Sequence, residues 1–130
     1  MAGRGNLDAE GRAPAAVHVG IVGPCSAGKS TLAIRLRALG YRVTEIRQEH
    51  AAAPEMWRRL TNPDVLIYLD VTMAVAAARE GLAAPSSWWP EERKVRLAHA
   101  RRHCDLYIDT TSLAPTEVAA TALRYLEGLN

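Results

Sequence analysis

Residues 17–31 read VHVGIVGPCSAGKST, and this stretch decides the fold. Residues 17–22 form a short and nearly continuous apolar run, which is typical of a strand buried on both faces of a parallel sheet. A glycine-rich turn follows over residues 23–28. A helix is then predicted over residues 29–39, with Gly40 as its stop. A strand, a glycine-rich turn and a helix in this order predict the first unit of an α/β sheet.

The turn and the residues after it match the phosphate-loop pattern G-x-x-x-x-G-K-[ST]. Gly23 and Gly28 allow backbone angles that other residues avoid, so that the loop can wrap around a phosphate. Lys29 is expected to reach the β- and γ-phosphates, and the Ser30 hydroxyl is expected to bind Mg²⁺. The residues expected to contact a nucleoside triphosphate are Gly23, Pro24, Cys25, Ser26, Ala27, Gly28, Lys29, Ser30 and Thr31.

The rest of the chain alternates between predicted strands and helices. Further strands are expected at 41–46, 65–70 and 106–108, and further helices at 54–60, 73–80, 90–103 and 115–127. This alternation predicts a three-layer α/β fold, in which a short parallel sheet of about four strands carries helices on both faces. Residues 1–14 are predicted to form a disordered tail before one domain at 15–130, and residues 81–89 a long loop.

Composition and length favour a cytoplasmic protein. The 130 residues suffice for one hydrophobic core, and two cysteines are too few for the disulfide framework of a small secreted chain. The sequence contains neither a signal peptide nor an apolar run near the ~20 residues that span a bilayer. With a net charge of only +2, the expected partners include neither nucleic acid nor a membrane.

Three segments resemble the P-loop nucleoside and nucleotide kinases, especially the thymidylate kinase and shikimate kinase groups. They are the glycine-rich turn with its helix, residues 63–71, which read PDVLIYLDV, and residues 104–110, which read CDLYIDT. The resemblance implies that Asp109 and Thr110 lie near the adenine and that Arg79 stands at the entry of a lid over the triphosphate. These kinases are usually longer, which implies that the acceptor pocket is abbreviated or built from residues 47–58.

The nucleotide is expected to be ATP. Regulatory GTPases read guanine through Asn-Lys-x-Asp or Thr-Lys-x-Asp, and neither sequence occurs here.

Two acids compete for the role of Mg²⁺ ligand or general base. Glu49 follows the predicted strand at 41–46, and Asp70 ends the strand at 65–70. Glu49 is slightly favoured, because its strand could lie beside the strand that precedes the glycine-rich turn if one strand of the fold has been lost. Residues 47–50 read RQEH and follow a strand at the edge where open α/β sheets bind ligands, so at least one of the four is expected to have a functional role.

Two functions follow from these patterns. The first is an ATP-dependent phosphotransferase that acts on a small hydroxylated metabolite or nucleoside, with Lys29, Glu49, Asp70 and Arg79 as its catalytic residues. The second is an ATP-binding or ATP-hydrolysing module that acts through a protein partner, and the short chain favours it. The sequence leaves open whether a partner chain or a second copy completes the site. Trp57 is expected to pack in the core or at its edge rather than against a ligand.

Overall fold

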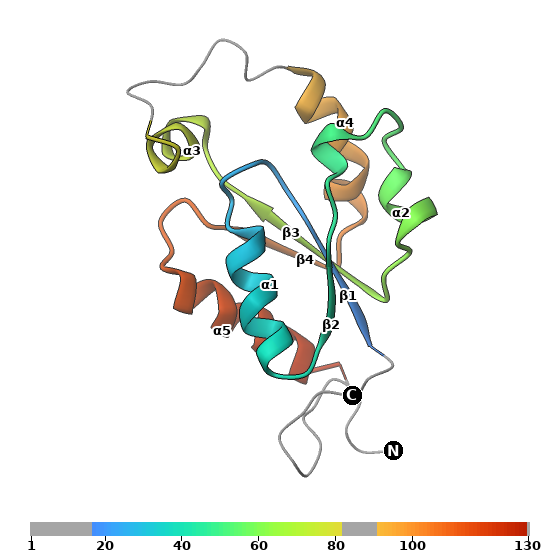
Figure 1. Cartoon of the computed structure of the whole chain (residues 1–130), viewed down its shortest axis with the longest axis vertical. Helices are drawn as coiled ribbons and strands as arrows, with labels where there is room; N and C mark the ends of the chain where they lie inside the picture. The colour runs from blue at the N-terminus through green and yellow to red at the C-terminus, as the bar shows by residue number, and fades with distance from the viewer. Residues whose placement is uncertain (1–16, 82–90, 130) are drawn as a thin grey trace.

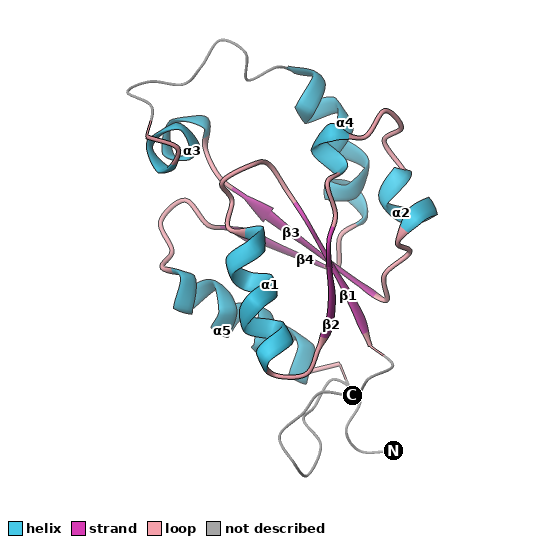
Figure 2. Ribbon diagram, viewed as in Figure 1, coloured by secondary structure: helices cyan, strands magenta, loops and turns pink. Residues whose placement is uncertain are grey.

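The computed structural model describes residues 17–81 and 91–129 (Figure 1). The tail expected at 1–14 and nearly all of the loop expected at 81–89 lie outside these residues. A four-stranded, all-parallel sheet in the order β2-β1-β3-β4 runs through the middle of the molecule (Figure 2). Its strands are β1 (His18–Val22), β2 (Arg42–Glu45), β3 (Val65–Asp70) and β4 (Leu106–Asp109).

Helical segments connect the strands, and a final helix follows β4. They are α1 (Lys29–Ala38), the 3₁₀ turn η1 (Gln48–His50), α2 (Met56–Leu60), α3 (Met73–Arg79), α4 (Glu91–His103) and α5 (Pro115–Glu127). Every predicted strand and helix occurs within two residues of its predicted bounds, whereas η1 was not predicted. The expected α/β class with a parallel sheet is therefore confirmed. In the described part of the chain, no helix is both long enough and apolar enough to cross a bilayer.

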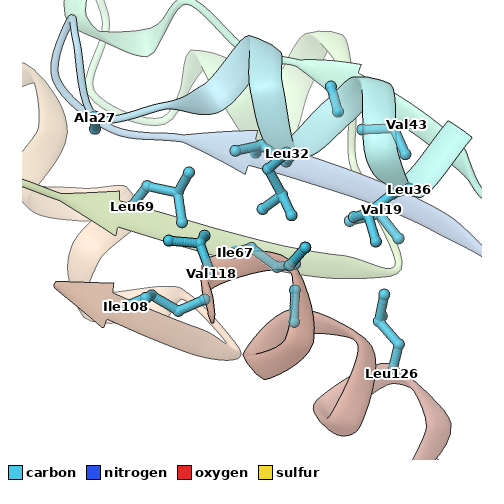
Figure 3. Close-up of a cluster of buried hydrophobic side chains, with 14 of the residues drawn as sticks. Val19, Ala27, Leu32, Leu36, Val43, Ile67, Leu69, Ile108, Val118 and Leu126 are labelled. Atoms are coloured by element: carbon cyan, nitrogen blue, oxygen red, sulfur yellow. The ribbon is translucent and has the colours of Figure 1, made fainter. Parts of the chain in front are cut away.

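The sheet has a hydrophobic cluster on each face, which is consistent with the expected three layers. Alternate residues of β3 serve the two faces, because successive side chains of a strand point in opposite directions. Ile67 and Leu69 pack with α1 and α5 in the larger cluster (Figure 3), and Leu66 and Tyr68 pack with α4 and α2 in the smaller one.

The order of the strands creates a switch point beside β1. Because β2 and β3 pair with opposite edges of β1, the connections after β1 and β2 lead to opposite sides of the sheet. Open α/β sheets bind ligands where the carboxyl ends of strands meet at such a point. Three segments meet at this edge: residues 23–28 after β1, residues 46–50 after β2 and residues 71–72 after β3.

Candidate functional site

The glycine-rich loop, residues 23–28, is shaped by its two glycines. Gly23 has a φ of 148°, and a Cβ there would lie 2.0 Å from the carbonyl oxygen of Leu69, so that no other residue fits. Gly28, with a φ of 98°, precedes the first turn of α1. Between them, Ser26 also adopts a left-handed conformation, with a φ of 67°. The loop therefore turns back on itself directly before a helix N-terminus.

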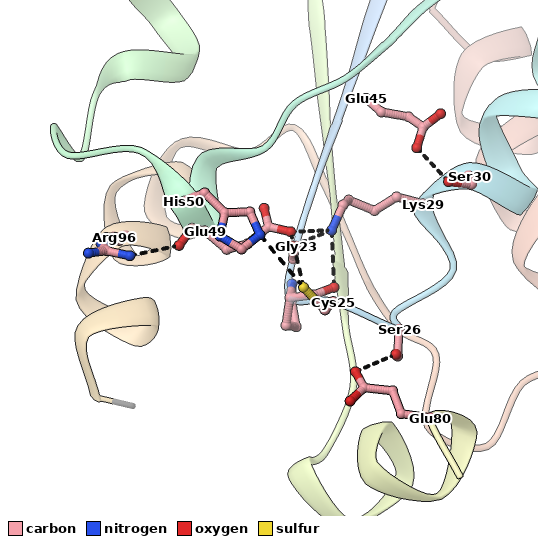
Figure 4. A network of polar contacts seen from close by, with 11 residues as sticks. Gly23, Cys25, Ser26, Lys29, Ser30, Glu45, Glu49, His50, Glu80 and Arg96 are labelled. Atoms are coloured by element: carbon pink, nitrogen blue, oxygen red, sulfur yellow. Dashed lines mark hydrogen bonds and ion pairs between the residues drawn. The ribbon is translucent and has the colours of Figure 1, made fainter. Parts of the chain in front are cut away.

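Lys29 folds back across this loop (Figure 4). Its Nζ donates to the carbonyl oxygens of Gly23 at 2.7 Å and Pro24 at 3.1 Å. The same ammonium group lies 2.9 Å from Oε2 of Glu49, and the two side chains are only 11% and 3% exposed. A shielded positive charge is thus held at the mouth of the loop.

Glu49 is positioned by η1, which packs against α4. Its Oε2 accepts from Lys29, whereas its Oε1 is buried and has no hydrogen-bond partner among the residues that the structure describes. The backbone oxygen of Glu49 accepts a hydrogen bond of 3.3 Å from Arg96 of α4. Of the two acids considered from the sequence, Glu49 is the one that meets the loop lysine.

Ser30 meets an acid that the sequence analysis did not select. Its Oγ donates to Oε1 of Glu45 at 2.6 Å (Figure 4). Arg37 lies 3.8 Å from the other oxygen of this carboxylate. Glu45 is the last residue of β2 and pairs in register with Ile21 of β1. Its position at the carboxyl end of a strand was the available signal, but only the pairing of β2 with β1 places it beside Ser30.

Asp70 lies elsewhere in the site. Its Oδ2 accepts a hydrogen bond from the Tyr107 hydroxyl, its Oδ1 accepts from the Val71 N–H at 2.9 Å, and Arg101 stands 4.0 Å away. Burial and the hydrogen bond to Asp70 raise the pKa of Tyr107 to about 12, so that this hydroxyl remains a donor at neutral pH. The structure therefore groups Asp70 with α4 and β4 and groups Ser30 with Glu45.

Arg79 and Thr110 join the loop to the end of β4. Arg79 donates to the backbone oxygens of Ser26 and Thr110, both at 2.8 Å. The buried Thr110 hydroxyl lies 3.1 Å from the oxygen of Ala27 and 2.9 Å from that of Asp70. Asp109 is exposed, and the Thr111 hydroxyl and N–H, as hydrogen-bond donors, lower the pKa of its carboxyl.

A cavity of about 480 Å³ opens between Arg79, Thr110 and the loop. Its lining consists of Ser26, Ala27, Gly28, Thr31, Leu32, Arg79, Thr110, Leu113, Pro115 and Val118. It combines apolar side chains with a few polar groups, as small-molecule sites do. We call it the α5 cavity.

A second cavity of about 410 Å³ lies beside α4. Pro24 forms its border with the loop, and Asp70, Lys94 and Arg101 supply its charged groups. We call it the α4 cavity. The glycine-rich loop thus borders both cavities, the α5 cavity through residues 26–28 and the α4 cavity through Pro24.

Three further contacts surround the loop. Ser26 donates to Glu80 at 2.7 Å, and Cys25 Sγ lies 3.6 Å from Glu49 Oε2 and 4.0 Å from His50 Nε2. None of these pairs was predicted, because each joins residues that lie far apart in the sequence.

A buried amide anchors η1. The Gln48 side chain accepts from the Trp57 N–H at 2.8 Å and donates to the backbone oxygens of Ala53 at 2.8 Å and Arg96 at 3.1 Å. Trp57 is only 6% exposed, which confirms that it packs in the core. These bonds fix η1, and with it Glu49, between α2 and α4.

Comparison of the sequence with models of known protein families gives no match, and comparison with curated proteins also gives none.

Proposed function

We propose that the chain is a P-loop phosphotransferase that binds Mg²⁺-ATP at residues 23–31 and transfers the terminal phosphoryl group to a small hydroxylated acceptor. The observation that carries the proposal is the place of the glycine-rich loop between two cavities, with Lys29 held across it. Phosphoryl transfer requires a donor and an acceptor on the two sides of one phosphate, and positioning supplies most of the catalysis.

The loop suits a phosphate. The N-terminus of α1 follows it directly, and helix N-termini favour anions through their N–H groups and dipole. Lys29 is shielded from solvent and pairs with Glu49, so that an arriving phosphate would have to replace this carboxylate as the partner of the ammonium group. Its ammonium group would stabilise the charge that develops on the transferred group.

The residues beside the loop fit Mg²⁺. The hydroxyl of Ser30 and the carboxylate of Glu45 are hard oxygen donors 2.6 Å apart, the donor type that Mg²⁺ prefers. When bound, Mg²⁺ neutralises charge on the phosphates. We assign the metal to Ser30 and Glu45, and we assign to Glu49 the positioning of Lys29.

We assign one substrate to each cavity. The α5 cavity suits the nucleoside, because Leu113 and Val118 offer apolar contact and Thr110 and Arg79 offer polar groups at its border with the loop. The α4 cavity suits the acceptor. Lys94 and Arg101 can attract an anionic group of the acceptor, and Asp70 can orient its hydroxyl.

The test measures ADP release from Mg²⁺-ATP with a panel of nucleosides, nucleoside monophosphates and small hydroxylated metabolites. The chain contains two lysines, Lys29 and Lys94, which make a matched pair of variants. Lys29→Ala should lose ATP binding and all ADP release. Lys94→Ala should bind ATP normally and raise the KM for the acceptor. ATP binding that survives Lys29→Ala would overturn the proposal.

A nucleotide-binding module that signals to a protein partner is the second candidate. The observation in its favour is the bond from Arg96 of α4 to the Glu49 backbone, which connects the loop lysine to a helix outside the loop. ATP bound through Lys29, without ADP release from any acceptor, would select this function over the kinase.

A further inference from the structure

Three metal-ligating side chains meet at the glycine-rich loop (Figure 4). Cys25 comes from the loop itself, and Glu49 and His50 come from η1. One ligand atom from each residue, a thiol sulfur, a carboxylate oxygen and an imidazole nitrogen, can be chosen so that all lie within 4.8 Å of one another. The proposed phosphotransfer uses the backbone of Cys25 as part of the loop, but it assigns no role to the side chains of Cys25 and His50.

The spacing of these atoms fits one metal ion. With Zn–S of ~2.3 Å and Zn–N or Zn–O of ~2.0 Å, a tetrahedral angle places the sulfur about 3.5 Å from each of the other ligand atoms. In this structure, Cys25 Sγ lies 3.6 Å from Glu49 Oε2 and 4.0 Å from His50 Nε2. The third separation, between Glu49 and His50, is at most 4.8 Å, and the exposed His50 and the half-buried Cys25 have room to rotate toward a metal.

The burial of Glu49 points independently to a missing cation. This carboxylate is 3% exposed in its side chain, and Lys29 pairs with only one of its oxygens. The other oxygen, Oε1, is buried without a hydrogen-bond partner within residues 17–81 and 91–129. An unsatisfied oxygen of a buried carboxylate is costly, and a metal ion held by both oxygens of Glu49, Oε2 near Cys25 and the unpaired Oε1, would offset that cost.

We propose that Cys25, Glu49 and His50 form a binding site for a divalent transition-metal ion of the Zn²⁺ type. A thiolate, an imidazole and a carboxylate are the ligands that Zn²⁺ takes, and a thiolate disfavours Mg²⁺ and Ca²⁺. Three protein ligands leave the fourth tetrahedral position open. The site is therefore distinct from the oxygen pair of Ser30 and Glu45.

Lys29 opposes the metal electrostatically. Its ammonium group lies 2.9 Å from Oε2 of Glu49. A metal ion bound to the same carboxylate would therefore lie close to this positive charge and be repelled by it. Removal of the Lys29 charge should therefore tighten metal binding, whereas it should abolish ATP binding. The two sites can be tested separately for this reason.

The test titrates Zn²⁺ into the full, reduced chain without nucleotide, in competition with a coloured chelator, and repeats the titration with Co²⁺. We expect one equivalent of metal and a thiolate-to-cobalt charge-transfer band. Cys25→Ser and His50→Ala should each weaken Zn²⁺ binding by about tenfold or more, since even the loss of an outer-shell partner costs that much. Cys25→Ser should also remove the cobalt band.

The matched controls are Cys104→Ser and His103→Ala, which remove a thiol and an exposed imidazole from the end of α4. They should leave the affinity unchanged, and Lys29→Ala should raise it. Because His50 is exposed, His50→Ala tests the site in a folded protein even if Glu49→Gln fails to fold. Equal affinity in wild type and His50→Ala, or a cobalt band that depends on Cys104, would overturn the proposal.

Discussion

Gly23 is the residue of the glycine-rich loop whose backbone packs directly against the backbone of β3. A methyl group there would lie 2.0 Å from the backbone oxygen of Leu69, whereas a methyl group on Gly28 meets no atom within 4 Å. Gly28→Ala should therefore cost only backbone strain, about 1–3 kcal/mol of unfolding free energy. Gly23→Ala adds a clash with the backbone and should cost more than about 3 kcal/mol.

Urea unfolding of the two variants measures this difference. Both glycines have positive φ angles, so that the comparison isolates the clash from the strain. Equal losses of unfolding free energy in the two variants would mean that the loop relaxes away from β3.

His99 links stability to pH. Its Nδ1 lies 3.1 Å from the Trp57 indole nitrogen, which can only donate, so His99 accepts and is neutral at this nitrogen. Burial is the main cause that lowers the pKa of His99, and the neighbouring His103 lowers it further. A lowered pKa means that the unfolded chain takes up the proton first. The contribution of His99 is thus present above pH ~6.5 and is lost as the pH falls toward the pKa of the folded state.

His99→Asn provides the test, because asparagine keeps an acceptor but does not titrate. Unfolding free energy should fall less steeply between pH ~7 and ~5 in the variant than in wild type. The free energy of unfolding of the variant should still fall somewhat over this pH range, because burial also lowers the pKa of His18. Identical slopes would exclude a contribution from His99.

At the scale of elements, Thr110 connects the end of β4 to the glycine-rich loop, to β3 and to α3 through hydrogen bonds of its hydroxyl. Its hydroxyl approaches the backbone oxygens of Ala27 and Asp70 and the guanidinium of Arg79. Thr110→Val keeps the shape but leaves buried polar groups without this partner, which should cost about 1–3 kcal/mol. Thr121→Val on α5 is the matched control, because the Thr121 hydroxyl donates to the Glu117 oxygen within the same helix.

Unfolding in urea compares the two variants. If Thr110→Val costs no more than Thr121→Val, the hydroxyl of Thr110 does not hold the loop to β4.

The elements also separate what the sequence could predict from what it could not. β1 and β3 were predictable because their nearly continuous apolar runs are typical of strands buried on both faces, and α1 because Leu32 and Leu36 recur at helical spacing. The η1 turn was not, because Gln48 is fully buried and its amide bonds to segments on α2 and α4 that only the folded chain brings together. Lys29 could be identified from its motif, but the choice of Glu45 as the partner of Ser30 required the pairing of β2 with β1.

At the scale of the whole molecule, nucleotide binding should raise the free energy of unfolding and therefore the Tm. A nucleotide at 100 times its Kd adds about 2.7 kcal/mol to the free energy of unfolding if it binds only the folded chain. Mg²⁺-ATP should therefore raise the Tm of wild type and of Lys94→Ala, and it should leave the Tm of Lys29→Ala unchanged. A thermal shift that persists in Lys29→Ala would place the nucleotide away from the glycine-rich loop.

The buried amide of Gln48 has a consequence for exchange with deuterated solvent. Its side-chain oxygen accepts a hydrogen bond of 2.8 Å from the backbone N–H of Trp57, and its side-chain nitrogen donates to the backbone oxygen of Arg96 in α4. The Trp57 amide proton is therefore protected by the packing of α4 as well as by α2. A five-residue helix such as α2 would ordinarily open often and exchange its protons quickly. The Trp57 amide should instead exchange slowly, at a rate set by how often α4 separates from η1. The exchange rate of this one amide thus reports how often α4 moves away from η1, the segment that carries Glu49.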